Sequence, residues 1–316
     1  MDQLKQEPKF RLARPSDYDE IIKLSMEAIS DGDDRLPFKY DRLMKMDNLY
    51  VMLAYYGEKL VGLAACCVVD DGRTAVPRVA RMLPEFRGQG IFKRLQQEVS
   101  EFMGRQFPRA CQLRLTSYHQ IPSMTKLVEL DILSSYAKEK TSRSHHLSTS
   151  SDSIEIEACT KEYLCDVIFC SSEVQKLFPH NVLVLDFFPI EPLRSNIDYM
   201  QQERDLYFAV EKCTDGSFPQ SVSFGTLSPA VKNVYWNVTV YTSDPALYEA
   251  HLLHQFKRAC EVIKGDFIFG SHHDKSLTDH GRRVLEERLH LELDEQVSKQ
   301  RLILNETKDV QRFSPA

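Results

Sequence analysis

The sequence predicts a mixed α/β protein whose mixed sheet is built from two consecutive halves of like element order. Short strand-like apolar segments alternate with amphipathic stretches of helical period. Their order in the first half recurs, at low identity, in the second. A polar stretch without periodicity, residues 138–153, is typical of a linker. Because 316 residues suit two medium cores better than one, we expect domains at 1–144 and 145–316.

The first half is expected to open with a strand at 10–13 and a helix, with Ser16 as N-cap and Asp19 as its acidic partner. The buried face of that helix should consist of apolar residues at helical spacing: Ile21, Ile22, Met26 and Ile29. The other predicted elements are a helix at 40–46, strands at 50–56 and 60–69, a strand at 74–83, an amphipathic helix after Gly90, a strand at 111–117 and a short helix at 122–130.

The second half is expected to follow the same course. Its predicted elements are a strand at 154–158, a helix at 160–178, strands at 206–211, 221–227 and 234–241, a helix at 245–263, a strand at 266–270, a helix at 277–289 and a strand at 300–305. Trp236 is predicted to lie in the core, and Asp244 with Pro245 should begin the helix at 245.

Composition excludes several classes of protein. The chain is 42% hydrophobic and 27% charged, which is ordinary for a globular protein. A net charge of -6 argues against nucleic acid as the partner, and no apolar run approaches the roughly 18 residues of a membrane span. The eight cysteines form no matched C-x-x-C pairs and no secretory signal precedes them, so we expect no metal and a reducing, cytoplasmic setting. The pair His272-His273 is not expected to bind zinc.

One motif carries chemistry. Arg87-Gly88-Gln89-Gly90 lies between a predicted strand and an amphipathic helix. The first N–H groups of a helix lack partners and carry positive partial charge, so they bind anions. Glycines let the backbone approach a phosphate without a clash at Cβ. The alternative interpretation is an ordinary exposed turn.

The wider stretch, Val79 to Leu95, resembles the signature of the GNAT acetyltransferases. The resemblance implies tandem GNAT-like domains, the second degenerate, and acetyl-CoA as co-substrate, bound by the loop and by the strand before it, which splays from its neighbour. A main-chain N–H near Met82 would polarise the thioester carbonyl. Phe92 departs from the Gly or Ala of many members. The cofactor-binding residues so implied are Arg81, Met82, Leu83, Arg87, Gly88, Gln89, Gly90, Ile91, Phe92 and Lys93.

The acid and base are not apparent from the motif. Many relatives have a Glu where this chain has Arg78, Val79 and Ala80, and a Tyr where our register places Val128. The nearby substitutes are Tyr118, His119 and Tyr136, each of which could equally be structural. The turn residues Asp70 and Asp71 are expected to serve their turn.

Over nearly its full length the chain also resembles the vertebrate histidine N-acetyltransferase family. This likeness rests on Leu-Pro-Glu-Phe-Arg-Gly-Gln-Gly-Ile and on Asp186-Phe187-Phe188-Pro189-Ile190-Glu191-Pro192-Leu193-Arg194-Ser195-Asn196. It implies transfer of acetyl to the α-amino group of a small amino acid, L-histidine, in a ternary complex. The implied acceptor residues are Asp186, Phe188, Ser195 and Asn196; an irregular connector is the alternative. A protein or peptide N-acetyltransferase, or an inactive CoA-binding scaffold, remain alternative functions.

Overall fold

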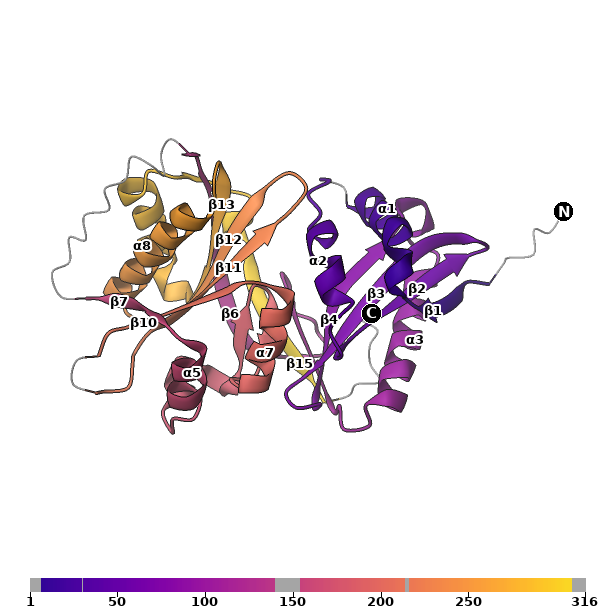
Figure 1. The fold of residues 1–316 in the computed structure, drawn as a ribbon, viewed down its shortest axis with the longest axis horizontal. Coiled ribbons are helices and arrows are strands. Elements are labelled where there is room, and N and C mark those ends of the chain that lie inside the picture. The colour runs from indigo at the N-terminus through magenta and orange to yellow at the C-terminus, as the bar shows by residue number, and fades with distance from the viewer. Residues whose placement is uncertain (1–6, 30, 140–153, 214–215, 309–316) are drawn as a thin grey trace.

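The computed structural model describes residues 7–29, 31–139, 154–213 and 216–308. Two lobes lie side by side, the N-terminal half in indigo to magenta and most of the C-terminal half in orange to yellow (Figure 1). One mixed sheet runs through both lobes in the order β1-β2-β3-β4-β5-β15-β6-β13-β12-β11-β10-β7, with β14 paired to β6 at the side. A separate pair, β8-β9, stands outside it.

The elements of the first half are β1 (Lys9–Leu12), a 3-10 turn (Pro15–Asp17), α1 (Tyr18–Ala28), α2 (Leu36–Leu43), β2 (Leu49–Tyr56), β3 (Lys59–Val69), β4 (Thr74–Met82), a 3-10 turn (Pro84–Phe86), α3 (Ile91–Gln106), β5 (Gln112–Ser117) and β6 (Thr125–Ala137). The strands predicted at 10–13, 50–56, 60–69, 74–83 and 111–117 are thereby confirmed within a residue or two, as is the helix after Gly90.

The elements of the second half are β7 (Ile156–Cys159), α5 (Lys161–Tyr163), a π turn (Leu164–Ile168), α6 (Val174–Leu177), a 3-10 turn (Pro179–Asn181), β8 (Leu183–Leu185), β9 (Phe188–Ile190), α7 (Arg194–Glu203), β10 (Leu206–Glu211), β11 (Val222–Pro229), β12 (Val234–Tyr241), α8 (Pro245–Val262), β13 (Phe267–His273), a 3-10 turn (Lys275–Leu277), α9 (Thr278–Arg283), a π turn (Val284–Arg288), β14 (Glu292–Leu293), a 3-10 turn (Val297–Lys299) and β15 (Arg301–Thr307). Trp236 is buried, as predicted.

The two halves exchange strands at the centre of the sheet. The C-terminal strand β15 pairs antiparallel with β5 on one side and with β6 on the other. In turn β6, from the first half, pairs with β13 of the second. A buried apolar cluster also joins them, since Leu63 of β3 and Phe224 of β11 belong to the same core. The proposed boundary at 144/145 falls outside the described residues and stays a prediction.

Five details of the prediction were wrong. The helix at 122–130 is the strand β6, because Val128, Leu130 and Ile132 alternate with Glu129 and Asp131, so the apolar period is two rather than that of a helix. The helix at 160–178 is broken into α5, a π turn and α6.

The entry into α1 also differs from expectation. A 3-10 turn precedes the helix, and Asp17, rather than Ser16, accepts a hydrogen bond at 2.7 Å from the N–H of Arg14. Met26 is 48% exposed, because the buried side of α1 runs through Leu24 and Ala28 instead. The helix predicted at 40–46 is α2, which begins at Leu36 because the Asp34 carboxylate accepts from the Leu36 N–H at 3.0 Å.

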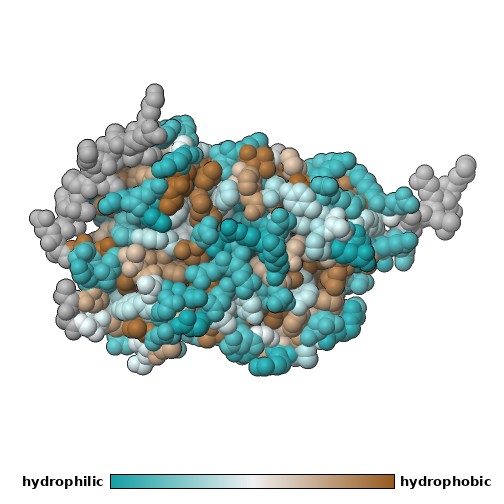
Figure 2. Space-filling model, in the orientation of Figure 1, coloured by the Kyte–Doolittle hydropathy of each residue, from teal (hydrophilic) through white to brown (hydrophobic). Residues whose placement is uncertain are grey.

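The surface carries no broad apolar face on the visible side. Hydrophilic residues gather along the middle, where the lobes meet, and hydrophobic residues form scattered groups to either side (Figure 2). Among the described residues, no helix combines the length and apolar content needed to cross a bilayer.

Candidate active site

The loop between β4 and α3 leaves a helix N-terminus open. Gly88 and Gly90 have φ of +73° and +77°, the left-handed region that glycine occupies without strain. A Cβ built on either residue would meet nothing within 4 Å. The N–H of Arg94 donates to the Gly90 carbonyl at 3.2 Å, so the N–H groups before it belong to the unpaired first turn. This loop is therefore a site where an anion can approach the backbone closely.

Side chains hold the loop in this shape. The Arg87 guanidinium donates to the Met82 carbonyl at 3.1 Å and to the Ala28 carbonyl at 2.8 Å. The Gln89 amide donates to the Glu85 carbonyl at 2.8 Å. Arg87 thus fixes the loop to β4 and α1, and its charge stays at the site. Lys93, one turn into α3, is exposed.

Next to the loop, β4 and β5 separate. They pair in parallel only at Thr74↔Gln112 and Ala75↔Leu113, after which β5 pairs with β15 and β4 continues against β3. Pro77, two residues past the last pair, has no N–H to offer a neighbouring strand. The β4–β5 gap left by this separation lies beside the loop.

The register of β4 shows which amide faces the gap. Leu83 donates its N–H to the Val61 carbonyl at 2.9 Å, and Met82 lies opposite Gly62 in the antiparallel pair. Because bonded and non-bonded positions alternate along such a pair, the Met82 N–H turns away from β3. Met82 and Leu83 are both among the residues predicted to bind the ligand. The N–H of Met82 faces the gap, whereas the N–H of Leu83 is already bonded to the Val61 carbonyl of β3.

Three cavities adjoin along this gap. The first, of 460 Å³, lies between the loop and α1. The second, of 170 Å³, lies between the strands and shares Ala80 and Phe92 with the first. The third, of 320 Å³, opens between the two halves; we call it the inter-half cavity. It shares Arg78 and Thr116 with the second and Arg81 with the first. Phe92 is half-buried against the apolar cluster beneath α3. Its side chain lines both the loop cavity and the cavity between the strands, and so lies at the boundary between them.

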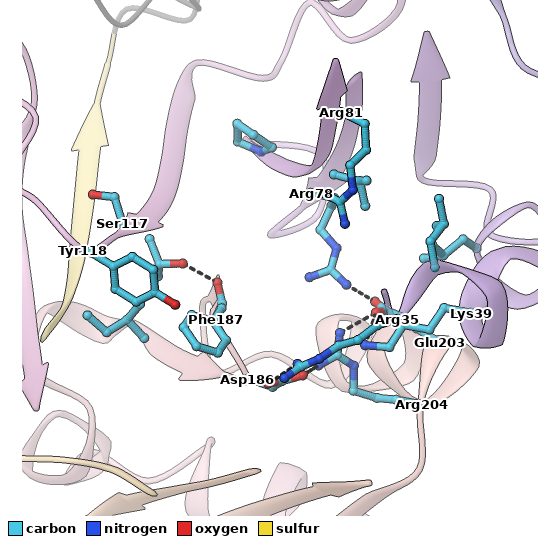
Figure 3. Close-up of a pocket in the computed structure, with 16 residues that line it drawn as sticks. Arg35, Lys39, Arg78, Arg81, Ser117, Tyr118, Asp186, Phe187, Glu203 and Arg204 are labelled. Atoms are coloured by element: carbon cyan, nitrogen blue, oxygen red, sulfur yellow. Dashed lines mark hydrogen bonds and ion pairs between the residues drawn. The ribbon is translucent and has the colours of Figure 1, made fainter. Parts of the chain in front are cut away.

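Charged side chains from four segments meet in the inter-half cavity (Figure 3). They come from the start of α2, from β4, from the turn between β8 and β9, and from the end of α7 and the residue after it. The charged residues that line it are Arg35, Lys39, Arg78, Arg81, Asp186, Glu203 and Arg204.

Two of the carboxylates are buried and tightly paired. Asp186 bonds to Arg204 at 2.6 Å and accepts from the Asn237 amide at 2.7 Å. Glu203 pairs with both Arg78 and Arg204. Burial alone would raise the pKa of Glu203, but the guanidinium groups of Arg204 and Arg78 outweigh it and hold that pKa at about 2. The pKa of Asp186 is likewise lowered, because Arg204 and Arg35 outweigh its burial.

Two cations have looser partners. Arg35 lies 3.5 Å from Asp186, and Lys39 lies 3.7 Å from Glu203. Burial and repulsion from Arg204 lower the pKa of Lys39 to about 7. The cavity thus presents positive charge that its own carboxylates do not closely neutralise.

The predicted catalytic candidates are dispersed. Tyr118 lines the inter-half cavity, with its ring edge-on to Phe187, and burial raises the pKa of its phenol. His119 is exposed, and its carbonyl accepts from the Ser117 hydroxyl. Tyr136 donates to Asp294 at 2.9 Å on the far part of β6 and does not line the cavity. Only Tyr118 lies where a substrate could reach it.

Residues 186–196, the segment with two prolines, line the cavity at one end and contact the β3–β4 turn at the other. Asp186 is in the cavity wall, and Phe188 is buried beneath Arg78, whose guanidinium carbon lies 4.1 Å from the ring centroid. Ser195 instead donates to Asp71 at 2.7 Å, and the Asn196 amide donates to Asp70 at 2.7 Å. These last two bonds tie α7 to the turn between β3 and β4.

That turn has the expected backbone. Asp70 and Asp71 both have positive φ, at 56° and 54°, so they serve their turn as predicted. Asp70 is also buried and pairs with Arg114 at 2.6 Å.

Sequence reasoning missed Arg35, Lys39, Glu203 and Arg204. They lie on or next to ordinary amphipathic helices, and only the packing of α7 against α2 and β4 brings them together. Arg78 and Arg81, two charges inside a predicted strand, were the visible signals.

At the matching junction of the second half, between β12 and α8, the described chain has an aspartate cap in place of a glycine loop. Asp244 accepts from the N–H groups of Ala246 and Leu247 at 2.7 and 3.0 Å, so the start of α8 is capped as predicted. His272 and His273 are buried, and among the described residues no group of three or more His, Cys, Asp or Glu is placed to hold a metal ion.

Comparison with known proteins bears on both halves. Residues 17–123 match the family model of the acetyltransferase (GNAT) family, and residues 153–274 match that of the histidine N-acetyltransferase C-terminal region. The chain is 24% identical over 275 residues to a histidine N-acetyltransferase of Scomber australasicus, and 25% identical over 284 residues to that of Oreochromis niloticus, each covering 81% of both chains.

Two solved structures share the fold. A tandem GNAT protein from the clavulanic acid biosynthesis pathway has a TM-score of 0.58 at 12% identity, covering 95% of this chain and 98% of its own. A putative acetyltransferase from Pyrococcus horikoshii has a TM-score of 0.56 at 11% identity, covering 97% and 91%. The predicted fold class, a mixed α/β sheet in a tandem GNAT-like arrangement, is confirmed.

Proposed function

This chain is an acyltransferase with a GNAT acetyltransferase domain, and from that premise we propose that it transfers the acetyl group of acetyl-CoA to the α-amino group of a small amino acid, with L-histidine the expected acceptor. The amine gains the acetyl group, CoA leaves as the thiol, and the amine gives up one proton. The observation that carries the proposal is the row of adjoining cavities, which runs from an open helix N-terminus to a cation-lined pocket across the β4–β5 gap.

The loop fits a diphosphate. The open space at Gly88 and Gly90 lets phosphate oxygens approach the first N–H groups of α3, whose dipole favours negative charge. The part of acetyl-CoA between the diphosphate and the thioester would lie along the gap, with the Met82 N–H directed at the thioester oxygen. A donor in that position typically lowers the barrier by about 3 kcal/mol.

The acceptor would occupy the inter-half cavity. Its 320 Å³ is at the small end of ligand pockets, which favours a free amino acid over a polypeptide. Holding amine and thioester on either side of β4 supplies much of the rate, so direct transfer needs no acyl-enzyme. Tyr118, whose raised pKa keeps it protonated at neutral pH, is positioned to give a proton to the departing thiolate.

The histidine acceptor is inferred from the relatives. Curated relatives at 24% and 25% identity are named histidine N-acetyltransferases. We also propose a reducing compartment such as the cytoplasm, which is supported by eight described cysteines that form no disulfide with one another.

The test combines binding with turnover. Isothermal titration should show one acetyl-CoA site per chain, and a free-thiol assay across the twenty amino acids should show turnover with histidine above the others. A short peptide with a free N-terminus should be a poor acceptor. Binding without turnover of any amine would contradict the proposal and support a CoA-binding scaffold; turnover of the peptide alone would support a protein N-acetyltransferase.

A further inference from the structure

Arg35 and Lys39 form a pair of like charges that needs a partner. Arg35 immediately precedes α2 and Lys39 lies one turn along it, so both side chains face the same side of the helix. Like charges at this spacing destabilise a helix when nothing lies between them. Both line the inter-half cavity, where Arg35 is 29% and Lys39 14% exposed.

The carboxylates of the cavity wall are only loose partners for these two cations. Asp186 and Glu203 each have close bonds to Arg204, and Glu203 to Arg78. The contacts of these carboxylates with Arg35 and Lys39 are longer, at 3.5 and 3.7 Å. Four cations thus face two carboxylates, while a fifth lining cation, Arg81, lies 3.5 Å from Asp34 outside the cavity wall.

We propose that Arg35 and Lys39 form a subsite for the carboxylate of the acceptor, so that the enzyme accepts free amino acids and rejects their amides. This inference rests on the proposed function and names the group that selects its substrate. The Arg35 guanidinium can hold both oxygens of a carboxylate in its planar fork, and Lys39 adds a point charge beside it.

Arg35 is held in position by the second half. Its guanidinium carbon lies 4.3 Å from the centroid of the Tyr235 ring, on β12. The Tyr235 hydroxyl donates at 2.5 Å to Asp33, two residues before Arg35. Stacking leaves the edge of the guanidinium to hydrogen-bond a ligand.

Asp33 is the anchor of this arrangement. It also accepts from the Asn233 amide at 2.7 Å and from the Lys232 N–H at 2.9 Å. The next residue, Asp34, accepts through its carbonyl from the Val231 N–H at 3.0 Å. The turn between β11 and β12 thus fixes the segment that carries the proposed subsite, and such pre-organisation lowers the entropy lost on binding.

The geometry gives the subsite a pH signature. Lys39 faces Arg35 on its own helix, Arg78 on β4, Asp186 from the β8–β9 turn, and Glu203 and Arg204 at the end of α7. Its pKa of about 7 in the empty cavity should rise when an anion binds beside it. Protonated Lys39 is therefore the binding form, and affinity for a carboxylate should fall as pH rises through about 7.

The experiment compares acids with matched amides. Kinetics with L-histidine and L-histidinamide should give a kcat/KM at least about tenfold higher for the acid. Arg35→Gln and Lys39→Met should each raise the KM for histidine by about 10- to 100-fold, leave the KM for acetyl-CoA unchanged and reduce the preference for the acid. Lys45→Met, at an exposed lysine just beyond α2, is the matched control and should change none of these.

A binding measurement separates the two proposals. Titration with N-acetyl-L-histidine and with its amide needs no turnover, and the acid should bind more tightly in the wild type but not in Arg35→Gln. The ratio of acid to amide affinity should fall between pH 6 and pH 8 in the wild type and not in Lys39→Met; both ligands carry the same imidazole, so the titration of that ring affects them alike. If acid and amide behave alike in both assays, or if neither binds, the subsite is wrong. A preserved preference in binding without any acetyl transfer would refute the proposed function and leave the subsite standing.

Discussion

The two halves share a strand–helix–strand unit, yet only in the first half does the described chain leave the start of the helix uncapped by a side chain. In both, a strand leads into a long helix and the strand after the helix pairs in parallel with the first: β4-α3-β5 and β12-α8-β13. In the first half the helix begins after Gly88 and Gly90, and in the second half after Asp244. A glycine loop leaves the N–H groups for a ligand, whereas an aspartate cap uses two of them and adds a negative charge.

The pairing of the two strands that flank each helix differs between the halves as well. β4 and β5 share two residue pairs before they separate, whereas β12 and β13 stay paired from Tyr235↔Ile268 to Thr239↔His272. The second half therefore has neither the loop nor the gap. Instead it contributes Asp186, Glu203 and Arg204 to the wall of the cavity beside the first half's gap. On the proposed function, the first half would bind acetyl-CoA and the second half would complete the acceptor cavity.

Gly90→Asp should produce the largest effect, because it gives the first half the character of the second. Two like charges 4 Å apart near a protein surface repel by about 4 kcal/mol, which corresponds to about a thousandfold weaker acetyl-CoA binding in titration calorimetry. Gly90→Asn is the control for strain at φ +77° and should bind far better than the Asp variant. Equal affinities in both variants would show that charge at this loop is irrelevant.

Arg204→Met tests the structural contribution of the second half. It leaves Asp186 and Glu203, both buried, without their shared partner, and we expect the free energy of unfolding to fall by about 3 kcal/mol in urea titration. Arg283→Met, at an exposed arginine of α9, should change it by less than about 0.5 kcal/mol. A stability loss no larger than that of the control would mean that the buried ion pairs contribute little.

Tyr118→Phe tests whether chemistry occurs at the cavity shared by both halves. Loss of a proton donor should lower kcat by about 10- to 100-fold with the acetyl-CoA affinity unchanged. Because burial raises the Tyr118 pKa, the wild-type rate should not fall as pH rises from 7 to 9 through ionisation of this phenol. Tyr136→Phe, outside the cavity, should retain wild-type kcat; a similar loss in both variants would argue against a role for Tyr118.

Asp244→Ala should have the smallest effect, and it tests whether the aspartate cap is what prevents acetyl-CoA binding in the second half. Removal of the cap should cost about 1 kcal/mol of stability in thermal or urea unfolding. It should leave the number of acetyl-CoA sites and their affinity unchanged, because the second half lacks the gap as well as the loop. Appearance of a second site would show that the cap alone suppresses binding there.

The features that the sequence reveals are those set by residues close to one another in the chain. The loop at Gly88 and Gly90 is local, so its residues and their order are enough to predict an open helix start. Strands β2, β3 and β4 alternate or are bounded by tight turns, and they were placed within a residue or two.

Most of what the sequence did not reveal depends on contacts between segments that lie far apart in the chain. The prediction of a helix at 122–130 overlooked the apolar period of two in β6, a strand whose partners β13 and β15 come from the other half of the chain. Lys39 lies on α2, one residue before the predicted start of that helix, and Glu203 ends α7, which was not predicted; only the packing of α7 against α2 and β4 makes a site of them. Ser195 and Asn196 stand in a family-like motif, yet they bond to the turn at Asp70 and Asp71 rather than line the cavity.

A crystal structure of the protein with CoA and L-histidine bound tests the central claim most directly. The account predicts the diphosphate within hydrogen-bonding distance of the backbone amides that begin α3, the thiol end in the β4–β5 gap and the amino acid in the inter-half cavity. Density for the nucleotide at the start of α8, or an empty loop beside Gly88 with the ligand bound elsewhere, would contradict it.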